Sequence, residues 1–299
     1  MARMDLSDIH AVRLAADGRA DHFGRTDAIF PWWSFTKTIL AIAALRLTEE
    51  RLLDLDAPFQ GQRYTLRQLL QHRAGVPNYG QLAEYHAAVG RGEAAWPRAR
   101  LLAAVGVDTL DFVPGTSWAY SNVGYLFVRE AIEAATASNL DAALRRLVFA
   151  PLGLTSARVA MQPGDLVDIH WPALHSYDPR WVYHGLVVGT PGDAAAILSA
   201  LMIPGRLLSP DTLTAMLHRH AIGGAIPGRP WTSHGYGLGL MIGTLDGAGR
   251  AIGHSGGGPH SVNAVHHFPD VDKSPTIATF TDGSDEGRAE WAATALATS

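Results

Sequence analysis

Ser34 and Lys37 are the residues of this 299-residue chain whose types and spacing first suggest chemistry. Because residues three apart lie one turn apart on the same helix face, the two side chains should be neighbours. The run 38–45 that follows is rich in Ala and Leu and apolar on nearly every face, which predicts a helix buried on all sides. Burial disfavours the charged form of a lysine, so the pKa of Lys37 should be lowered. A serine hydroxyl beside a neutral amine is an activated nucleophile.

The same spacing is also typical of a structural pair. Pro31 favours a turn at the helix entrance, and Ser34 suits the first turn, where its hydroxyl can cap. A lysine in that position often reaches water with its ammonium group while its stem packs on the helix. The run 38–45 contains no acidic residue that would make Lys37 half of a surface ion pair, which favours the chemical interpretation.

Tyr120 and Asn122 form a second group, at the entrance of a predicted helix. Beside a neutral lysine, the Tyr120 phenol could carry a proton, and the Asn122 carboxamide could hold Lys37 or a substrate amide. The ordinary alternative is a buried tyrosine whose hydroxyl has a hydrogen-bond partner.

Ser255 lies in a third motif, Gly-His-Ser-Gly-Gly at 253–257, which matches the G-x-S-x-G nucleophile elbow. That elbow requires a helix directly after the serine and a catalytic acid and histidine later in the chain. Here glycines, a proline and a strand-like segment follow. We therefore reject Ser255 as the nucleophile.

Taken in order, S-x-x-K at 34–37, Y-x-N at 120–122 and H-x-G at 254–256 resemble the motifs of the serine β-lactamase and penicillin-binding-protein superfamily. The branch that looks most similar is the class C-related one, with its family VIII esterases and its D-amino-acid-specific peptidases and amidases. The likeness extends from about residue 8 to the end of the chain. The segments that carry it are 33–37, 64–77, 114–125, 151–154, 235–239 and 253–257.

This resemblance implies an α+β fold with two lobes, an antiparallel sheet flanked by helices and an inserted all-helical lobe. Strand signals at both ends of the chain with helical signals between them favour the same arrangement. We expect one β-lactamase-like domain over 1–299, with the sheet lobe at about 1–56 and 186–299 and the helical lobe at about 57–185.

The resemblance also implies roles for the motif residues. Ser34 would be the nucleophile that forms an acyl-enzyme, with Lys37 and Tyr120 as its base partners and Tyr120 passing the proton to the leaving group. Asn122 would orient Lys37 and the substrate.

The third motif would supply the edge of the site. His254 and Gly256 would lie on the strand beside it, and the backbone N–H groups of Ser34 and Gly257 would form the oxyanion hole. Glycines there would let the backbone approach the substrate closely. Trp118 would line an acyl or leaving-group pocket, the alternative being ordinary core packing.

The chain departs from the family at His254, where β-lactamases and D,D-peptidases have a lysine that helps to hold the substrate's carboxylate. A histidine would give a weaker charge that depends on pH near neutrality. We expect β-lactam turnover and D-Ala-D-Ala recognition to suffer. The portion before Ser34 looks short for the family, which suggests a trimmed N-terminus.

Composition excludes several classes of function. The net charge of −4 and the pI near 6.4 argue against nucleic acid and anionic membranes as partners. The absence of cysteine excludes disulfides, a thiol nucleophile and cysteine-ligated metal sites. The N-terminal residues have no apolar core of signal-peptide length, and run 38–45 is too short to span a bilayer, so we expect a cytoplasmic protein.

The remaining pattern predicts individual elements. Strands are expected at 8–14 and 19–24, joined by a turn at Asp17 and Gly18, and at 236–242, 251–253, 261–268 and 276–280. Helices are expected from Ser34 to the turn at 52–58, after a Thr65 cap to residue 70, and at 123–137, 140–149, 191–203, 209–220 and 284–298. Segment 164–185 should be a loop, and 222–230 either a mobile lid or a loop.

The other polar residues favour structural roles. The chain has fourteen histidines, but adjacent ones such as His266 and His267 point to opposite faces of a strand and do not chelate together. We expect no metal and no cofactor. Acidic residues in turns, such as Asp282, Asp285 and Glu286, should be solvated or capping.

The sequence therefore predicts a metal-independent serine hydrolase that acts through an acyl-enzyme. Small or medium carboxylic esters are the expected substrates, with amides as a further class. A D-amino-acid amidase or aminopeptidase and a weak β-lactamase are the alternatives among enzymes. A catalytically weak ligand-binding or sensor protein is the alternative from another class.

Overall fold

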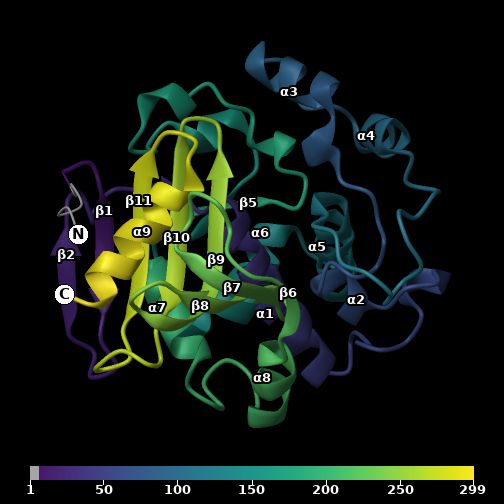
Figure 1. Ribbon diagram of the computed structural model, residues 1–299. Helices are drawn as coiled ribbons and strands as arrows, with labels where there is room; N and C mark the ends of the chain where they lie inside the picture. Colours follow the sequence, from purple (N-terminus) through teal and green to yellow (C-terminus); the bar gives the residue numbers. More distant parts are fainter. Residues whose placement is uncertain (1–6) are drawn as a thin grey trace.

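An antiparallel sheet dominates the computed structural model, which describes residues 7–299 (Figure 1). In this part of the chain eight strands pair in the order β2-β1-β11-β10-β9-β8-β7-β6. The strands are β1 (His10–Leu14), β2 (Ala20–Phe23), β6 (His220–Gly223), β7 (Trp231–Tyr236), β8 (Met241–Leu245), β9 (Gly249–Gly258), β10 (Ser261–His267) and β11 (Thr276–Asp282).

The sheet joins the two ends of the chain, as the sequence predicts. Strand β1 pairs with β11, with His10 opposite Phe280 and Leu14 opposite Thr276. The β1–β2 connection turns at Gly18, which adopts φ 84°, a left-handed conformation that glycine takes without steric cost. The N-terminal hairpin thereby extends a sheet whose other strands come from the last third of the chain.

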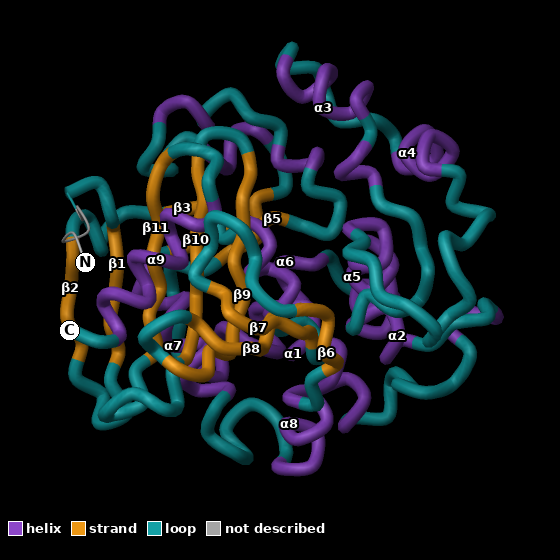
Figure 2. The backbone as a smooth tube through the Cα atoms, viewed as in Figure 1, coloured by secondary structure: helices purple, strands orange, loops and turns teal. Residues whose placement is uncertain are grey.

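Helices cover both faces of the sheet and fill one side of the molecule (Figure 2). Helix α9 contacts β9, β10 and β11 on one face, while α7 contacts β1, β10 and β11 on the other. Helices α2 to α6 gather beside the sheet. The helices are α1 (Thr36–Glu49), α2 (Leu66–Leu70), α3 (Ala83–Gly90), α4 (Arg98–Val105), α5 (Asn122–Thr136), α6 (Leu140–Leu144), α7 (Pro191–Leu201), α8 (Pro210–Leu217) and α9 (Glu286–Ala297).

The predicted cap at Thr65 is present, and a second cap precedes α7. Thr65 closes a reciprocal capping box with Gln68 at the start of α2. Thr190 accepts a hydrogen bond from the Asp193 N–H at the start of α7. The predicted helix α1 is buried on nearly all sides. Segment 164–185 is an irregular connection with three short 3-10 turns, as expected.

The prediction of a strand at 236–242 is wrong, because the centre of this segment is the turn that joins β7 to β8. Strand β9 is longer than the three residues expected at 251–253, and the predicted helix 209–220 ends at Leu217 before strand β6. A small sheet was also missed, in which β5 (Leu186–Gly189) pairs with β3 (Phe30–Pro31) and β4 (Arg158–Ala160). Strands this short carry too few residues to show a period.

No helix in residues 7–299 is long and apolar enough to cross a membrane. The sequence predicts that the N-terminal residues form no signal peptide. Most of these residues lie outside the part of the chain that the structure describes. The lobe boundaries near residues 57 and 186 stay a prediction.

Candidate active site

A 3-10 turn, Trp33–Phe35, leads into α1 and presents Ser34. Trp33 adopts φ 38°, a left-handed conformation that costs a residue with a side chain on the order of 1–3 kcal/mol. Its indole Nε1 donates to Ser261 Oγ at 2.9 Å, which helps to hold the turn in place. The cap expected from Ser34 is wrong, because its hydroxyl bonds to side chains and not to the first turn of α1.

Lys37 lies one turn further along, with none of its surface exposed. Its Nζ lies 3.2 Å from Ser34 Oγ and 3.1 Å from Nε2 of His184. Burial lowers the pKa of Lys37 well below its usual value, against a smaller opposite effect of Glu286. The predicted direction of this shift is confirmed, and a neutral amine beside the serine can accept its proton.

Tyr120 lies on the other side of the serine, with its hydroxyl 2.8 Å from Ser34 Oγ. The imidazole of His72 packs against its ring at 4.3 Å and accepts a hydrogen bond from the Ser121 N–H through Nδ1. Burial raises the pKa of Tyr120, so the phenol keeps its proton at neutral pH and can donate it.

Asn122, the first residue of α5, faces the space in front of Ser34. The expected hydrogen bond between Asn122 and Lys37 is not found among the described residues. His184 takes that place, through the contact with Nζ given above. Sequence reasoning treated His184 as a structural histidine, because nothing in its local sequence links it to a lysine 147 positions earlier.

Strand β9 forms the wall opposite the helices. It pairs with β8 only from Gly249 to Gly253, whereas it pairs with β10 as far as Gly258. The outer half of β9, 254–258, therefore has one edge that β8 does not cover. A Cβ at Gly256 would lie 2.6 Å from the Ser34 nitrogen, so this strand can approach the serine only without a side chain there.

Gly257 is less confined than its neighbour. The atoms nearest to a Cβ at this position belong to the Glu286 side chain, at 3.2 Å and beyond. The oxyanion hole predicted at the N–H groups of Ser34 and Gly257 stays a prediction, and the bare edge of β9 beside the serine suits it.

His254 lies on β9 and is buried, with Nε2 2.8 Å from the Tyr236 hydroxyl. Burial, with the nearby Lys37, lowers the pKa of His254 to about 3. The expectation of a charge that changes near neutral pH is therefore wrong. Desolvation keeps this imidazole uncharged, and it presents no cation to a substrate carboxylate.

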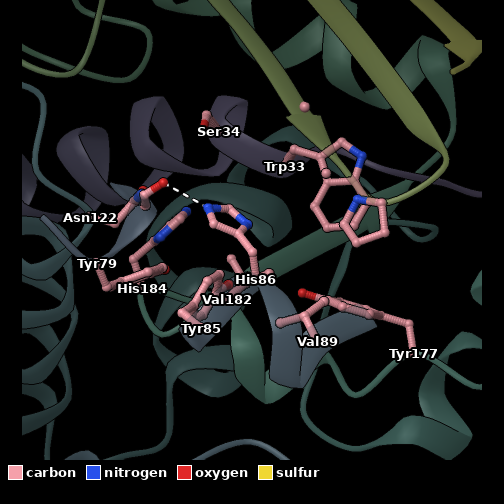
Figure 3. Close-up of a pocket in the computed structure, with 14 residues that line it drawn as sticks. Trp33, Ser34, Tyr79, Tyr85, His86, Val89, Asn122, Tyr177, Val182 and His184 are labelled. Carbon is pink, nitrogen blue, oxygen red and sulfur yellow. Dashed lines mark hydrogen bonds between the residues drawn. The ribbon is translucent and has the colours of Figure 1, made fainter. Parts of the chain in front are cut away.

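Two pockets meet at Ser34. The first is lined mainly by aromatic and apolar side chains, and Figure 3 shows Ser34 and Trp33 on one side of it and Tyr85, Val89 and Tyr177 across from them. The fourteen described residues of this lining include no Asp, Glu, Lys or Arg.

The second pocket lies on the side of Tyr120. Its lining includes Trp118, Tyr236, His254, Arg229 and Glu286. The expectation of Trp118 in a pocket wall agrees with this position, and the residue also packs against Tyr236 at a ring distance of 6.1 Å. Ile222 and Ile226 border the same pocket, and the prediction of a lid or loop at 222–230 is wrong at its start, because Ile222 lies in β6.

Ser255 lies on β9 beside this second pocket, but its hydroxyl is held elsewhere. The Oγ atom donates to Glu290, and the residue is 2% exposed. No base comparable to the Lys37 amine is among its described partners. This environment agrees with the rejection of Ser255 as a nucleophile.

The prediction for Glu286 was wrong. Its carboxylate is neither a cap nor fully solvated, since it lines the second pocket and pairs with Arg229 at 2.9 Å. Asp285 does cap α9, by accepting from the Gly287 N–H. Asp285 and Glu286 cannot be distinguished from the local sequence. Their different surroundings result only from the packing of α9 against β9. In residues 7–299 no group of three His, Cys, Asp or Glu side chains is placed to hold a metal ion.

Comparison with known proteins places these features in a family. The family description "Beta-lactamase" matches residues 12–298. Penicillin-binding protein 4* of Bacillus subtilis (strain 168) is 24% identical over an alignment of 269 residues, and the match covers 79% of this chain and 57% of that protein. The chain thus spans little more than half the length of this curated relative.

Solved structures share the fold. The D-stereospecific amidohydrolase from Streptomyces sp. superposes with a TM-score of 0.77 at 24% identity, over 96% of this chain and 92% of that one. The D-amino acid amidase from Ochrobactrum anthropi SV3 gives 0.79 at 19% identity, over 96% and 94%. A penicillin binding protein from Bacillus halodurans gives 0.75 at 20%, over 96% and 94%.

Proposed function

Because the chain belongs to the beta-lactamase family of serine hydrolases, we propose that it hydrolyses small or medium carboxylic esters through an acyl-enzyme at Ser34. The observation that carries this proposal is the position of Ser34 Oγ between two groups of opposite function. Lys37 Nζ, a buried amine, lies 3.2 Å away, and the protonated Tyr120 hydroxyl lies 2.8 Å away.

The proposed reaction begins when Ser34 Oγ attacks the substrate carbonyl carbon and gives its proton to Lys37 Nζ. The carbonyl oxygen becomes an oxyanion beside the bare edge of β9, where the N–H groups of Ser34 and Gly257 would stabilise it. When the intermediate collapses, Tyr120 protonates the departing alkoxide and Lys37 returns a proton to Tyr120. Water then attacks the acyl-enzyme by the reverse route, which releases the acid and restores the serine.

The position of Tyr120 distinguishes the two pockets. The group that receives the Tyr120 proton leaves on the side of Tyr120, which belongs to the lining of the second pocket. We therefore name the second pocket the leaving-group pocket and the first the acyl pocket. The acyl pocket is aromatic and its described lining has no Asp, Glu, Lys or Arg, which suits an uncharged, apolar acyl group.

This lining favours esters of uncharged acids over the alternatives. A D-amino acid amide, the substrate class suggested by the name of the Ochrobactrum anthropi neighbour, would bring an ammonium group into the acyl pocket without a carboxylate to receive it. A β-lactam would bring a carboxylate to the uncharged His254. Amidase and weak β-lactamase activity are the second candidates. A sensor protein would bind its ligand in the same pocket and would not turn it over.

The test is intact-mass detection of adducts with a fluorophosphonate probe on the wild type, Ser34→Ala and Ser255→Ala. We expect an adduct that only Ser34→Ala loses, since Ser255 is held by Glu290. In parallel, turnover of p-nitrophenyl phenylacetate is compared with that of D-phenylalanine p-nitroanilide and a chromogenic cephalosporin.

Dominant ester turnover is the expected result. Dominant anilide or cephalosporin turnover would move the assignment to an amidase or a β-lactamase. An adduct without turnover of any of these compounds would favour the sensor, and loss of the adduct only in Ser255→Ala would contradict the choice of nucleophile.

A further inference from the structure

A carboxylate lies in the wall of the leaving-group pocket. Glu286 is the first residue of α9, and its side chain remains 35% exposed. One oxygen, Oε2, pairs with Arg229 at 2.9 Å. The other, Oε1, lies beside Gly257, 3.2 Å from the point where a Cβ would sit. The carboxylate therefore faces the same part of β9 that is expected to hold the oxyanion.

Arg229 does not neutralise this carboxylate by itself, because a second one shares it. Glu290, fully buried, accepts from Nε of Arg229 at 2.6 Å and also pairs with its Nη2. Glu290 also accepts from Ser255 and from Trp231 Nε1. One guanidinium thus faces two carboxylates. Since Glu290 takes the bidentate geometry that binds a guanidinium best, Arg229 neutralises Glu286 less completely. Burial, with a smaller contribution from Glu290, raises the pKa of Glu286 above its usual value.

Neither His254 nor the nearby Lys37 supplies the missing positive charge. His254 is uncharged because burial lowers its pKa to about 3, and burial lowers the pKa of Lys37. The His234 ring lies near Gly224, with Nδ1 2.7 Å from the carbonyl oxygen. Arg229 is thus the one arginine or lysine among the described residues of this lining, and both carboxylates contact it.

Aromatic side chains complete the wall. Trp118 and Tyr236 line the same pocket, 6.1 Å apart between ring centres. The faces of such rings attract cations, quaternary ammonium groups above all. A pocket whose one arginine is shared by two carboxylates, and whose walls are aromatic, has the composition that favours a cation over an uncharged group of equal size.

We propose that Glu286 makes the leaving-group pocket select alcohols that carry an ammonium group and disfavour those that carry a carboxylate. This inference rests on the proposed function, since it assigns the substrate class of the same site. The substrates would be esters of an uncharged, apolar acid with an amino alcohol. Glu286 acts here as a specificity-determining residue and takes no part in the bond-making steps.

The kinetic test holds the acyl group constant and varies the leaving group. Proton release is followed for phenylacetylcholine, for its uncharged isostere 3,3-dimethylbutyl phenylacetate and for O-phenylacetyl glycolate. We expect kcat/KM to be roughly five- to tenfold higher for the cation than for the isostere, and lower for the anion. In Glu286→Gln, which keeps the shape of the side chain, the ratio of cation to isostere should fall towards one.

Asp285→Asn is the matched control. It removes one negative charge at the same end of α9, keeps a residue able to cap the helix, and lies outside the described pocket lining. This variant should retain the wild-type ratio. An equal loss of the ratio in both variants would mean that the general field of the helix end is responsible, which contradicts the role of Glu286.

A binding measurement separates this inference from the proposed function. Ligand-observed NMR compares choline with 3,3-dimethylbutanol on the wild type and Glu286→Gln, and it needs no turnover. Tighter binding of choline that Glu286→Gln abolishes supports the inference even if no ester is hydrolysed. Equal binding of the two alcohols to the wild type overturns it, even if the esters are hydrolysed.

Discussion

At the scale of single residues, the site depends on keeping ionisable groups uncharged. Burial lowers the pKa values of Lys37, His184 and His72, which lie in contact around Ser34 and Tyr120. Each of these groups would repel the charged form of the others. The arrangement therefore favours a neutral amine beside the nucleophile, which is the form that can accept a proton.

The pH dependence of turnover should reflect this neutrality. Lys37 acts as a base only when deprotonated, and burial lowers its pKa, so kcat/KM for a p-nitrophenyl ester should be level through neutral pH and fall only on the acid side. Burial raises the pKa of Tyr120, so its proton should not be lost within the range measured. A profile from about pH 5 to about pH 10 tests this. A rate that keeps rising towards pH 10 would assign Lys37 an ordinary pKa and contradict the prediction.

The same burial should cost stability. The pKa of Lys37 is lower in the folded protein than in the unfolded chain. Such a lysine contributes stability above its unfolded pKa of about 10.4. That contribution is lost as pH falls towards the folded pKa. Lys37→Met should therefore raise the free energy of unfolding at neutral pH, by about 1–2 kcal/mol, while abolishing turnover. The gain should shrink near pH 10.

Urea denaturation at the two pH values measures this change. Lys273→Met is the matched control, because it makes the same substitution at an exposed position. A Lys37→Met variant that is less stable than the wild type at both pH values would show that the contacts with Ser34 and His184 outweigh the cost of burial.

At the scale of elements, strand β9 combines pairing with access. Its inner half is covered by β8 and its outer half is open towards Ser34. Gly258 also packs its backbone against the Trp33 ring, where a Cβ would lie 2.5 Å from the ring atoms. The strand and the nucleophile turn are therefore fitted to each other without intervening side chains.

Two glycines of β9 give a matched pair of variants. Gly256→Ala places a methyl group 2.6 Å from the Ser34 nitrogen, so the strand or the nucleophile turn must move, and kcat should fall by about a hundredfold or more. In Gly257→Ala the new methyl group meets side-chain atoms alone, Glu286 at 3.2 Å and Val262 at 3.4 Å, and the N–H is kept, so the loss should be at least tenfold smaller. Ester kinetics and thermal unfolding of both variants test this. Equal losses in both would contradict the contact between Gly256 and Ser34.

The sequence predicted the elements with strong local signals. Helices α1, α5 and α9 have sustained apolar patterns or clear caps, and the positions of Ser34 and Lys37 follow from the helix that carries Lys37. The turn between β7 and β8 was mistaken for a strand because its leucines, Leu238 and Leu240, are fully buried. In the sequence alone, the apolar residues of a buried turn resemble those of a strand, because the residues they pack against are not known.

The missed site residues have a different cause. His184 and Glu286 reach the site from segments distant from Ser34 in the chain, and neither belongs to a motif. Their roles depend on which face of a loop or helix meets β9 and α1. That information is tertiary, and residue types and spacing do not contain it.

At the scale of the whole molecule, the C-terminal helix and the sheet are joined by buried polar groups. Arg229, Glu290 and Ser255 connect the segment before β7, helix α9 and strand β9. His266 on β10 is fully buried nearby, and neither of its ring nitrogens has a partner in the described structure. Removing one member of a buried ion pair typically costs about 3–5 kcal/mol, so this face of the sheet tolerates charge changes poorly.

Acid should therefore destabilise the fold before the carboxylates titrate. Burial lowers the pKa of His266 from 6.5 to about 4, so on acidification the unfolded chain binds this proton first. The stability that the neutral ring provides is present above pH 6.5 and is lost as pH falls to about 4, by about 3 kcal/mol for this residue alone. Buried His254, whose pKa is lowered to about 3, adds a loss in the same direction.

Urea denaturation between about pH 7 and about pH 4 measures the slope of unfolding free energy against pH. His266→Phe removes the titrating ring but keeps an aromatic group against Trp231, so the slope should decrease by about one proton, or 1.4 kcal/mol per pH unit. His22→Asn, at an exposed position, is the control for the loss of a histidine. An unchanged slope in His266→Phe would mean that this ring is protonated in the folded protein. The polar network under α9 would then hold a second buried cation beside Arg229, and its two carboxylates would be fully neutralised.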